Sequence, residues 1–291
     1  MSTTKTNSKP NPVLQQLSEG IANLTSEPAW RAWLDMQAKL YKYSFFNCLL
    51  ISIQRPDATA CAGFRQWQQR HDRQVRTGEK AIWILAPIFR KIKVVVKDEA
   101  TGEEREETQE VLSFFKSVKV FDIGQTDGPD LPEPCKPLAG DDAGLYASLE
   151  AYAHKAGYTV AKESLGGAHG YCNPVSEHIG IEVSDSPAQQ AKSLAHEIAH
   201  AILHGTDFDM SRADAELEAE SVAYIVCQHF GLDTARYSFE YITWWQGQAA
   251  KDVQEGLRAS GQRISNAAKK VIAGVERELE APAKAAPANL F

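Results

Sequence analysis

Residues 194–200 read LAHEIAH, and this short run indicates both the fold and the chemistry of the second half of the chain. His196 and His200 are four residues apart, which on a helix places them about 40° apart in azimuth and one turn apart in height. Both imidazoles can then reach one tetrahedral ion, with Glu197 beside them as a base for an attacking water. Two ordinary helix histidines are the alternative, but the apolar neighbours Leu194 and Ile198 favour a helix buried in a core.

A catalytic zinc takes three protein ligands and keeps a position for water, so a second helix should supply the third ligand. Residues 215–223, AELEAESVA, offer three carboxylates. Glu216 and Glu220 are four apart and share a helix face, whereas Glu218 points about 200° away. One of the pair can bind the ion while the other accepts from a ligand histidine. Three acids on a solvated face are the alternative. His204 lies four residues past His200 and could support that histidine, but we favour a helix-end histidine near Gly205.

The runs AHEIAHAILH (195–204) and ExEAxxxA (216–223) resemble the ImmA/IrrE-like group of zincin metallopeptidases, over roughly residues 165–235. The resemblance implies Zn²⁺ as the cofactor, with His196, His200 and Glu216 as its ligands. It implies Glu197 as the catalytic general base. Glu220 then stands as the alternative ligand, or as the group one turn on that supports a ligand histidine.

Composition and charge limit the function classes. The chain has 291 residues with 43% hydrophobic and 24% charged residues, which excludes a disordered or fibrous protein. Five scattered cysteines without a CxxC argue against a disulfide scaffold, and no apolar run approaches the length of a membrane span. We therefore expect a cytoplasmic protein with reduced thiols and no membrane partner.

The net charge of −7 hides a basic segment. Residues 30–97 hold 13 basic and 4 acidic side chains, whereas residues 98–135 hold 3 and 11. A basic field inside an acidic chain is typical of a site for a polyanion. The segment also carries ten aromatic residues, and cations interleaved with aromatics are what single-stranded nucleic acid requires. The alternatives are aromatics that belong to the core, as the helical spacing of Trp30 and Trp33 indicates, and a solvated loop over residues 70–80.

The stretch YSFFNCLLISIQRPDATACAGFRQWQQRHDRQVRTGEKAIWILAPI (43–88) closely resembles the N-terminal single-strand-binding domain of the ArdC antirestriction proteins. The points of match include Tyr43-Ser44, Asn47, Gly63-Phe64, Trp67 and Gly78-Glu79-Lys80. ArdC proteins also carry a C-terminal zincin-like domain, so both halves indicate one family. The residues that we expect at single-stranded DNA are Tyr43, Asn47, Arg65, Trp67, Arg70, Arg73, Arg76 and Lys80.

We predict an α+β fold in five segments: a disordered tail (1–12), an α+β single-stranded-DNA-binding domain (13–123), a Pro/Gly-rich linker (124–142), a mainly helical zincin-like metallopeptidase domain with a small sheet (143–280) and a loose tail (281–291). In the first domain, periodicity predicts two helices within 28–53 and a short helix at 63–68. Strands are expected at 81–88, 91–96 and 112–121, with an acidic hairpin tip at 98–108. In the second domain, helices are expected at 143–156, 187–204, 211–230 and about 239–280, and strands near 158–161 and 179–183.

The resemblance implies a plasmid-borne protein that binds single-stranded DNA, carries a zinc metallopeptidase domain and protects incoming conjugative DNA from host restriction. Its peptide substrate would be a protein met on or near DNA. Two alternatives stay open. The first is a DNA-binding protection module whose zinc domain is catalytically silent. The second is a soluble zinc peptidase with no nucleic-acid role, in which the basic segment is a solvated face.

Overall fold

The computed structural model describes residues 11–97, 104–131, 142, 144–205, 210–232 and 250–280. The chain has an α+β fold that begins with three helices, α1 (Pro12–Asn23), α2 (Glu27–Lys39) and α3 (Phe45–Gln54). Asn11 caps α1 by accepting a hydrogen bond from the backbone N–H of Val13, and Pro12 occupies the first helical turn. The predicted helix pair within 28–53 corresponds to α2 and α3.

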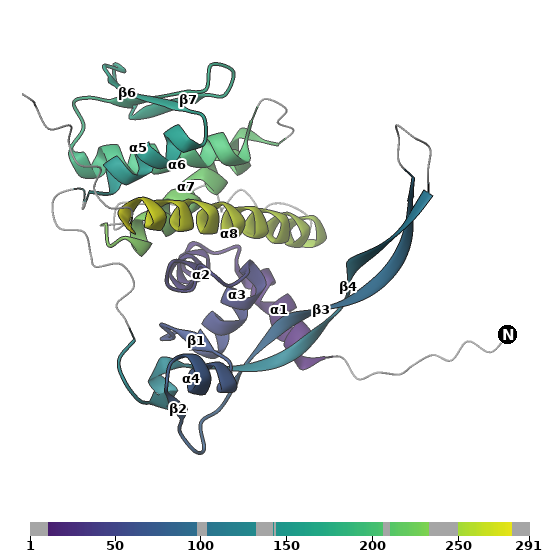
Figure 1. Cartoon of the computed structure of the whole chain (residues 1–291). Helices are drawn as coiled ribbons and strands as arrows, with labels where there is room; N and C mark the ends of the chain where they lie inside the picture. Colours follow the sequence, from purple (N-terminus) through teal and green to yellow (C-terminus); the bar gives the residue numbers. More distant parts are fainter. Residues whose placement is uncertain are drawn as a thin grey trace, which may run out of the picture.

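A long antiparallel hairpin follows, formed by β3 (Ile82–Lys97) and β4 (Glu104–Asp122). Asn47 fixes its base to α3, because the side-chain amide donates to the carbonyl of Leu85 and accepts from the N–H of the same residue. The outer half projects from the body as an arm (Figure 1). The strands predicted at 81–88 and 91–96 form the single strand β3. Residues 104–108, which the sequence assigns to the hairpin tip, are paired with β3, because the register continues to Lys97 opposite Glu104.

Small elements close the base of the hairpin: β1 (Cys61–Ala62), α4 (Phe64–Arg70), β2 (Gln74–Val75), the 3₁₀ turn η1 (Ile123–Gln125) and β5 (Thr126–Asp127). β1 pairs with β4, and β2 pairs with β5. Residues 123–127 therefore belong structurally to the first half of the chain, although the sequence places the start of the linker at 124. Most of the predicted linker, residues 132–141, lies outside the described residues.

The second half begins with α5 (Leu145–Lys155) and a three-stranded sheet of β6 (Thr159–Glu163), β7 (Gly170–Asn173) and β8 (His178–Glu182) in the order β6-β8-β7. β6 runs parallel to β8, and β7 runs antiparallel to it. The sheet lies on α5 and α6 (Pro187–Leu203), and α7 (Arg212–His229) packs against α6. Strand β7 is absent from the sequence prediction because its four residues lack an extended alternating pattern.

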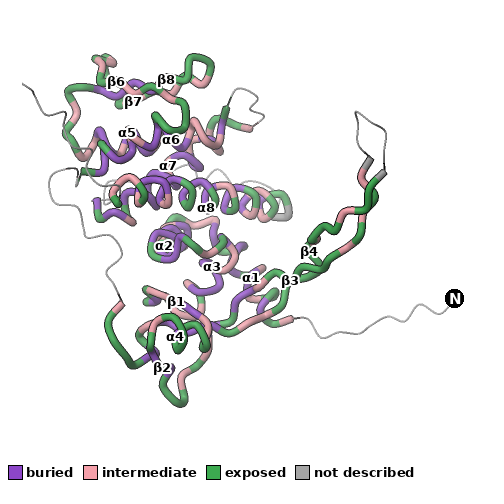
Figure 2. Tube along the Cα trace, in the orientation of Figure 1, coloured by how far each residue is buried: buried purple, intermediate pink, exposed green. Residues whose placement is uncertain are grey.

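The two halves share one continuous hydrophobic core, in which α8 (Ala250–Glu280) lies between α7 and the N-terminal helices (Figure 1). Two glycines let α8 approach its neighbours closely. A Cβ at Gly261 would lie 2.5 Å from the ring of Phe45, and one at Gly274 would lie 2.3 Å from the ring of Tyr152. Figure 2 shows buried residues running through these helices, while the hairpin arm is exposed or half-buried. The division into two domains stays a prediction.

Within the described ranges, no helix combines the length and apolar character needed to cross a bilayer.

Candidate functional site

Two neighbouring helices, α6 and α7, hold the predicted metal residues. Ser186 caps the N-terminus of α6, and its hydroxyl accepts from the N–H of Gln189. Ser211 caps the N-terminus of α7, and its hydroxyl accepts from the N–H of Asp214. Both helices are buried where they face the core, α7 over most of its residues and α6 over about half. Each helix is therefore fixed in rotation and in height, so the side chains that face the shared seam are held in register.

Three ligand atoms converge at this seam. His196 Nε2 lies 3.0 Å from His200 Nε2, and Glu216 Oε2 lies 3.4 Å from the first nitrogen and 3.7 Å from the second. A tetrahedral ion with bonds of about 2.0–2.1 Å holds neighbouring ligand atoms about 3.3–3.4 Å apart. Two imidazoles and one carboxylate in this triangle therefore fit a divalent metal ion. The assignment of the three ligands stays a prediction, which this geometry supports.

Ion pairs and shared protons link the three side chains of the triangle. Burial lowers the pKa of His196, but its contacts with Glu216 and then Glu220 outweigh burial and raise that pKa to about 10. Contacts of Glu216 with His196 and then with His200 hold the pKa of the Glu216 carboxyl well below its usual range. A proton on His196 Nε2 and a metal ion thus compete for one lone pair, as is general for imidazole ligands.

The outer nitrogen of each ligand histidine has a defined partner. His196 Nδ1 lies 3.1 Å from Glu220 Oε2, and since a carboxylate only accepts, this nitrogen carries the proton. In the neutral ring, Nε2 then keeps its lone pair for the metal. Glu220 therefore lies on the far side of His196 from the triangle. The sequence leaves open which of Glu216 and Glu220 meets the two Nε2 atoms. In the structure Glu216 lies at these atoms and Glu220 lies behind His196.

His200 is oriented by a buried chain of polar groups that ends at α8. His200 Nδ1 lies 2.9 Å from His204 Nδ1, and His204 Nε2 lies 3.4 Å from the fully buried carboxylate of Glu218. Arg263 Nε donates to both oxygens of Glu218, at 3.0 and 3.1 Å. Burial raises the pKa of Glu218, but its contacts with His204 and then Arg263 outweigh burial and lower it. An ionised Glu218 accepts from His204 Nε2–H, so His204 Nδ1 accepts from His200 and leaves His200 Nε2 unprotonated.

His204 does stand at the C-terminal end of α6, as the sequence indicates, and it also contacts His200, which is the alternative that the spacing of four left open. The sequence reasoning gave Glu218 no role.

We expect Glu218→Gln to weaken metal binding by about 10–100-fold, the usual cost of losing a group that orients a metal ligand. Glutamine keeps the shape but offers an amide in place of the charge that fixes the tautomer of His204. Titration calorimetry with Zn²⁺ on the chelator-treated chain measures the effect. Glu255→Gln, at an exposed carboxylate of α8, is the control and should bind as the wild type does.

Glu197 lies next to the triangle in an apolar setting. It is buried, and burial raises the pKa of its carboxyl, an effect that the nearby His196 and then His200 oppose. Gly170 of strand β7 leaves the space: a Cβ there would lie 3.0 Å from Glu197 Oε1. Cys172 on the same strand stays a thiol, because burial and then the charge of Glu197 raise its pKa to about 11. A carboxylate of raised pKa beside a metal triangle suits proton transfer.

The predicted DNA-binding residues separate into two groups. Five of them have partners within the fold. Trp67 is 1% exposed and donates from Nε1 to the carbonyl of Phe121, and Arg73 is buried with hydrogen bonds to Thr126 and the carbonyl of Gly128. Asn47 holds the hairpin, Tyr43 donates to the carbonyl of Cys61, and Arg76 pairs with Glu79 and Asp127. Trp67 in this position offers no ring face for a base to stack on.

The other three, Arg65, Arg70 and Lys80, are exposed. Exposed aromatic rings gather on the hairpin, at Trp83, Phe89, Phe114 and Phe115, whereas the exposed rings of Phe64 and Tyr171 lie on other elements. The sequence argument gives no role to the two phenylalanines of β4, because they lie in a segment whose net charge is acidic. The signal that could have found them is two adjacent aromatics in one strand. Successive side chains point to opposite faces of a strand, so one of the two must face away from a core that covers only one face.

Comparisons with known proteins agree with both halves. Residues 11–121 match the family described as the N-terminal domain of the anti-restriction factor ArdC. Residues 153–236 match the family described as the IrrE N-terminal-like domain, of the M78 peptidases. An uncharacterized protein of Bacillus anthracis is 26% identical over 296 aligned positions, which cover 84% of this chain. The chain spans about half the length of this curated relative, 49%.

Two solved structures share the fold. The metal-free crystal structure of the antirestriction ArdC protein from the R388 plasmid aligns with a TM-score of 0.54 at 21% identity, covering 90% of this chain and 98% of that one. The Mn(II)-bound structure of the same protein aligns with a TM-score of 0.56 at 20% identity, covering 90% and 97%. At these identities the likeness establishes the fold, and the M78 match together with the triangle supports a metal ion in this chain.

Proposed function

Because the chain belongs to the ArdC-like antirestriction family, we propose that it binds single-stranded DNA, carries a zinc peptidase centre and protects incoming plasmid DNA from host restriction in the cytoplasm. The observation that carries the proposal is the convergence of His196, His200 and Glu216 on a chain that also presents an exposed aromatic and basic arm. The substrate class that follows is a protein associated with the bound DNA.

For the metal centre, two imidazoles and one carboxylate favour zinc, although the same donors accept other divalent ions. When bound, the ion supplies Lewis-acid polarisation and makes a water more acidic. Glu197 would take the proton of the attacking water on a carboxylate oxygen and return it to the leaving amine. Little solvent reaches the contact between α6 and α7 around the proposed ligands, since Glu197 and Glu218 are both buried there.

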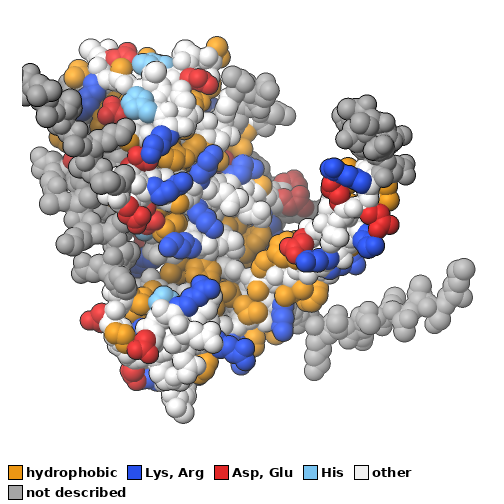
Figure 3. All heavy atoms as spheres, in the orientation of Figure 1, with side chains coloured by type: hydrophobic (Ala, Val, Ile, Leu, Met, Phe, Trp, Pro, Cys, Tyr) orange, Lys and Arg blue, Asp and Glu red, His pale blue; other side chains and the backbone are white. Residues whose placement is uncertain are grey.

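For the DNA surface, the arm formed by β3 and β4 supports the proposal. Phe89, Phe114 and Phe115 are 55%, 56% and 51% exposed, and Figure 3 shows hydrophobic side chains gathered near the base of the arm with Lys and Arg beside them. Register puts Trp83 opposite Lys119 and Ala86 opposite Lys116. Exposed rings with neighbouring cations are what unstacked bases and phosphates bind, at about 1–3 kcal/mol per stacked base.

We expect Phe89→Ala combined with Phe114→Ala to weaken binding of an oligothymidylate by at least tenfold, because each ring contributes about 1–3 kcal/mol of stacking. Fluorescence anisotropy at two salt concentrations measures the change. Val95→Ala, which shortens an exposed apolar side chain further along the same arm, is the control. Equal affinity of the double variant and the wild type would remove the arm from the DNA surface.

The two alternatives differ from the proposal in testable ways. A zinc peptidase without a nucleic-acid role predicts no oligonucleotide binding even at low salt. A protection module with a silent zinc domain predicts that Glu197 is dispensable, because metal binding alone would preserve the fold.

We expect Glu197→Gln to leave Zn²⁺ binding intact and to abolish protection, since loss of a general base costs about 10²–10⁴ in rate. The measurement is the efficiency of plasmid transfer into a restricting host, compared with a non-restricting host as the control for transfer itself. Full protection by Glu197→Gln would support the silent-domain alternative instead.

A further inference from the structure

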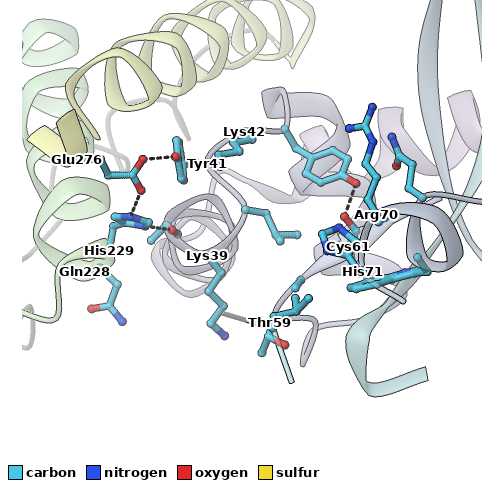
Figure 4. A pocket seen from close by; sticks show the side chains of 18 residues that line it. Lys39, Tyr41, Lys42, Thr59, Cys61, Arg70, His71, Gln228, His229 and Glu276 are labelled. Carbon is cyan, nitrogen blue, oxygen red and sulfur yellow. Dashed lines mark hydrogen bonds and ion pairs between the residues drawn. The ribbon is translucent and has the colours of Figure 1, made fainter. Parts of the chain in front are cut away.

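A pocket lies where the two halves of the chain meet, well away from the metal triangle (Figure 4). Its volume is about 900 Å³, within the range of about 300–1,000 Å³ that is usual for small-molecule sites. The first half contributes the end of α2, the strand β1 and helix α4, and the second half contributes residues of α7 and α8. Glu216 and His229 lie at opposite ends of α7, which separates the triangle from the pocket by about 20 Å along the helix.

Cations surround this pocket. In Figure 4, Lys39 and Lys42 lie towards one side of it, and Arg70 and His71 lie across from them. Lys39, Lys42 and Arg70 are exposed, and none of the three forms an ion pair with a carboxylate in the part of the chain that the structure describes. Lys42 instead lies over the ring of Tyr41, 5.3 Å from its centroid. Three cations without a protein counter-charge around one hollow attract an anion.

The only carboxylate that lines the pocket, among the described residues, is already engaged. Glu276 accepts a hydrogen bond from the hydroxyl of Tyr41 at 2.6 Å, and its other oxygen lies 3.3 Å from His229 Nε2. Its charge is therefore partly offset and leaves the field of the pocket positive. Asp72 and Asp130 line a neighbouring hollow beyond Arg70, at the outer edge.

The floor is apolar and aromatic. Leu40, Ala62 and Leu131 line it together with the ring of His71, which lies 5.1 Å from the ring of the buried Trp67 behind it. An apolar floor beneath a cationic rim matches a nucleotide, which joins a flat base to a phosphate. A peptide without acidic groups would leave the three cations unpaired.

We propose that this pocket holds an unpaired nucleotide of the bound single strand, with its base on the apolar floor and its phosphates between Lys39, Lys42 and Arg70. The inference rests on the proposed binding of single-stranded DNA. It adds the place at which the bound strand contacts the junction between the two halves of the chain. A nucleotide held there contacts α2, α4 and α7 at once, so DNA binding stabilises the junction that also positions α7.

The test uses the full chain and an oligothymidylate of about 16 nucleotides. For Lys39→Gln combined with Arg70→Gln we expect about tenfold weaker binding, and a slope of log affinity against log salt that is shallower by about 1.4, or about 0.7 per lost phosphate contact. Arg258→Gln combined with Lys270→Gln removes the same charge from α8 outside the pocket, and should keep the wild-type affinity and slope.

The outcomes separate the two proposals. A wild-type chain that binds no single strand at low salt overturns the proposed function and this inference with it. A wild type that binds, with a double variant equal to it in affinity and slope, overturns the pocket assignment alone. Thermal melting of both double variants at the wild-type temperature excludes misfolding as a cause.

A photo-crosslinking experiment locates the strand independently and distinguishes it from a free nucleotide. Oligothymidylate substituted with 5-iodouracil should crosslink to peptides within residues 38–43 and 59–71, and free dTMP should compete for those crosslinks. Crosslinks confined to the β3–β4 arm would overturn the assignment. If dTMP binds the pocket and saturating oligonucleotide does not displace it, the assignment is also overturned, and the pocket belongs to a free nucleotide.

Discussion

Glu216→Gln should abolish the stabilisation of the chain by zinc, whereas Glu220→Gln should only weaken zinc binding by about 10–100-fold. Glu216 Oε2 lies within 3.4 and 3.7 Å of the two Nε2 atoms, while Glu220 contacts the outer nitrogen of His196. Zinc at 100 times its dissociation constant stabilises a native protein by about 2.7 kcal/mol. At about 2–4 °C per kcal/mol, the wild type should therefore melt about 5–11 °C higher with zinc than without it.

The two glutamates are matched controls for each other, because the substitution, the helix and the lost charge are the same. Thermal melting with and without zinc separates them, and the metal-free melting temperature of each variant corrects for the lost ion pairs with His196. A zinc shift that survives in Glu216→Gln but disappears in Glu220→Gln would exchange the two assignments.

Trp30→Ala should destabilise the whole chain by about 3–5 kcal/mol, the usual cost of truncating a buried tryptophan. Trp30 is fully buried, packs edge-on against Trp33 at 4.7 Å between centroids, and donates from Nε1 to Ser221 Oγ across the α2–α7 contact. The melting temperature should fall by about 6–20 °C. Because the core is continuous, the signal from both halves should shift together.

Trp30→Phe is the control: it keeps most of the apolar volume and loses the hydrogen bond, which predicts a smaller cost of about 1–3 kcal/mol. Urea unfolding followed by tryptophan fluorescence, to which both halves contribute, and by zinc release, which reports on the second half, tests for independent unfolding. Two separated transitions, of which Trp30→Ala shifts only the first, would show that the halves unfold independently.

Local features of this protein could be predicted from the sequence because their physical cause is local. The helix over 187–204 follows from its capping serine, its proline in the first turn and its apolar stripe, and α6 spans Pro187–Leu203. The spacing of His196 and His200 then requires that both face one side. The α+β fold and the family were predicted from such patterns together with the points of match, and the comparisons confirm both.

Burial at the predicted DNA surface could not be predicted in this way. Trp67 stands among polar and basic neighbours, yet it is buried because its indole N–H meets the carbonyl of Phe121, 54 residues later in the chain. Arg73 is buried for the same kind of reason, since backbone carbonyls near Gly128 accept from its guanidinium. Partners this far apart leave no trace in a local pattern.

By itself, the amino-acid order determined that one helix carries two imidazoles on one face with a carboxylate beside them, because spacing along a helix is fixed by the helix geometry. Only the tertiary structure distinguished the positions of Glu216 and Glu220. Both lie on the same face of α7, and the height at which α7 crosses α6 places Glu216 at His196 Nε2 and Glu220 at His196 Nδ1. The tertiary structure likewise brings His204, Glu218 and Arg263, which are far apart in the sequence, into one chain of contacts. It also formed the cationic pocket, whose walls come from segments that meet only when the shared core closes.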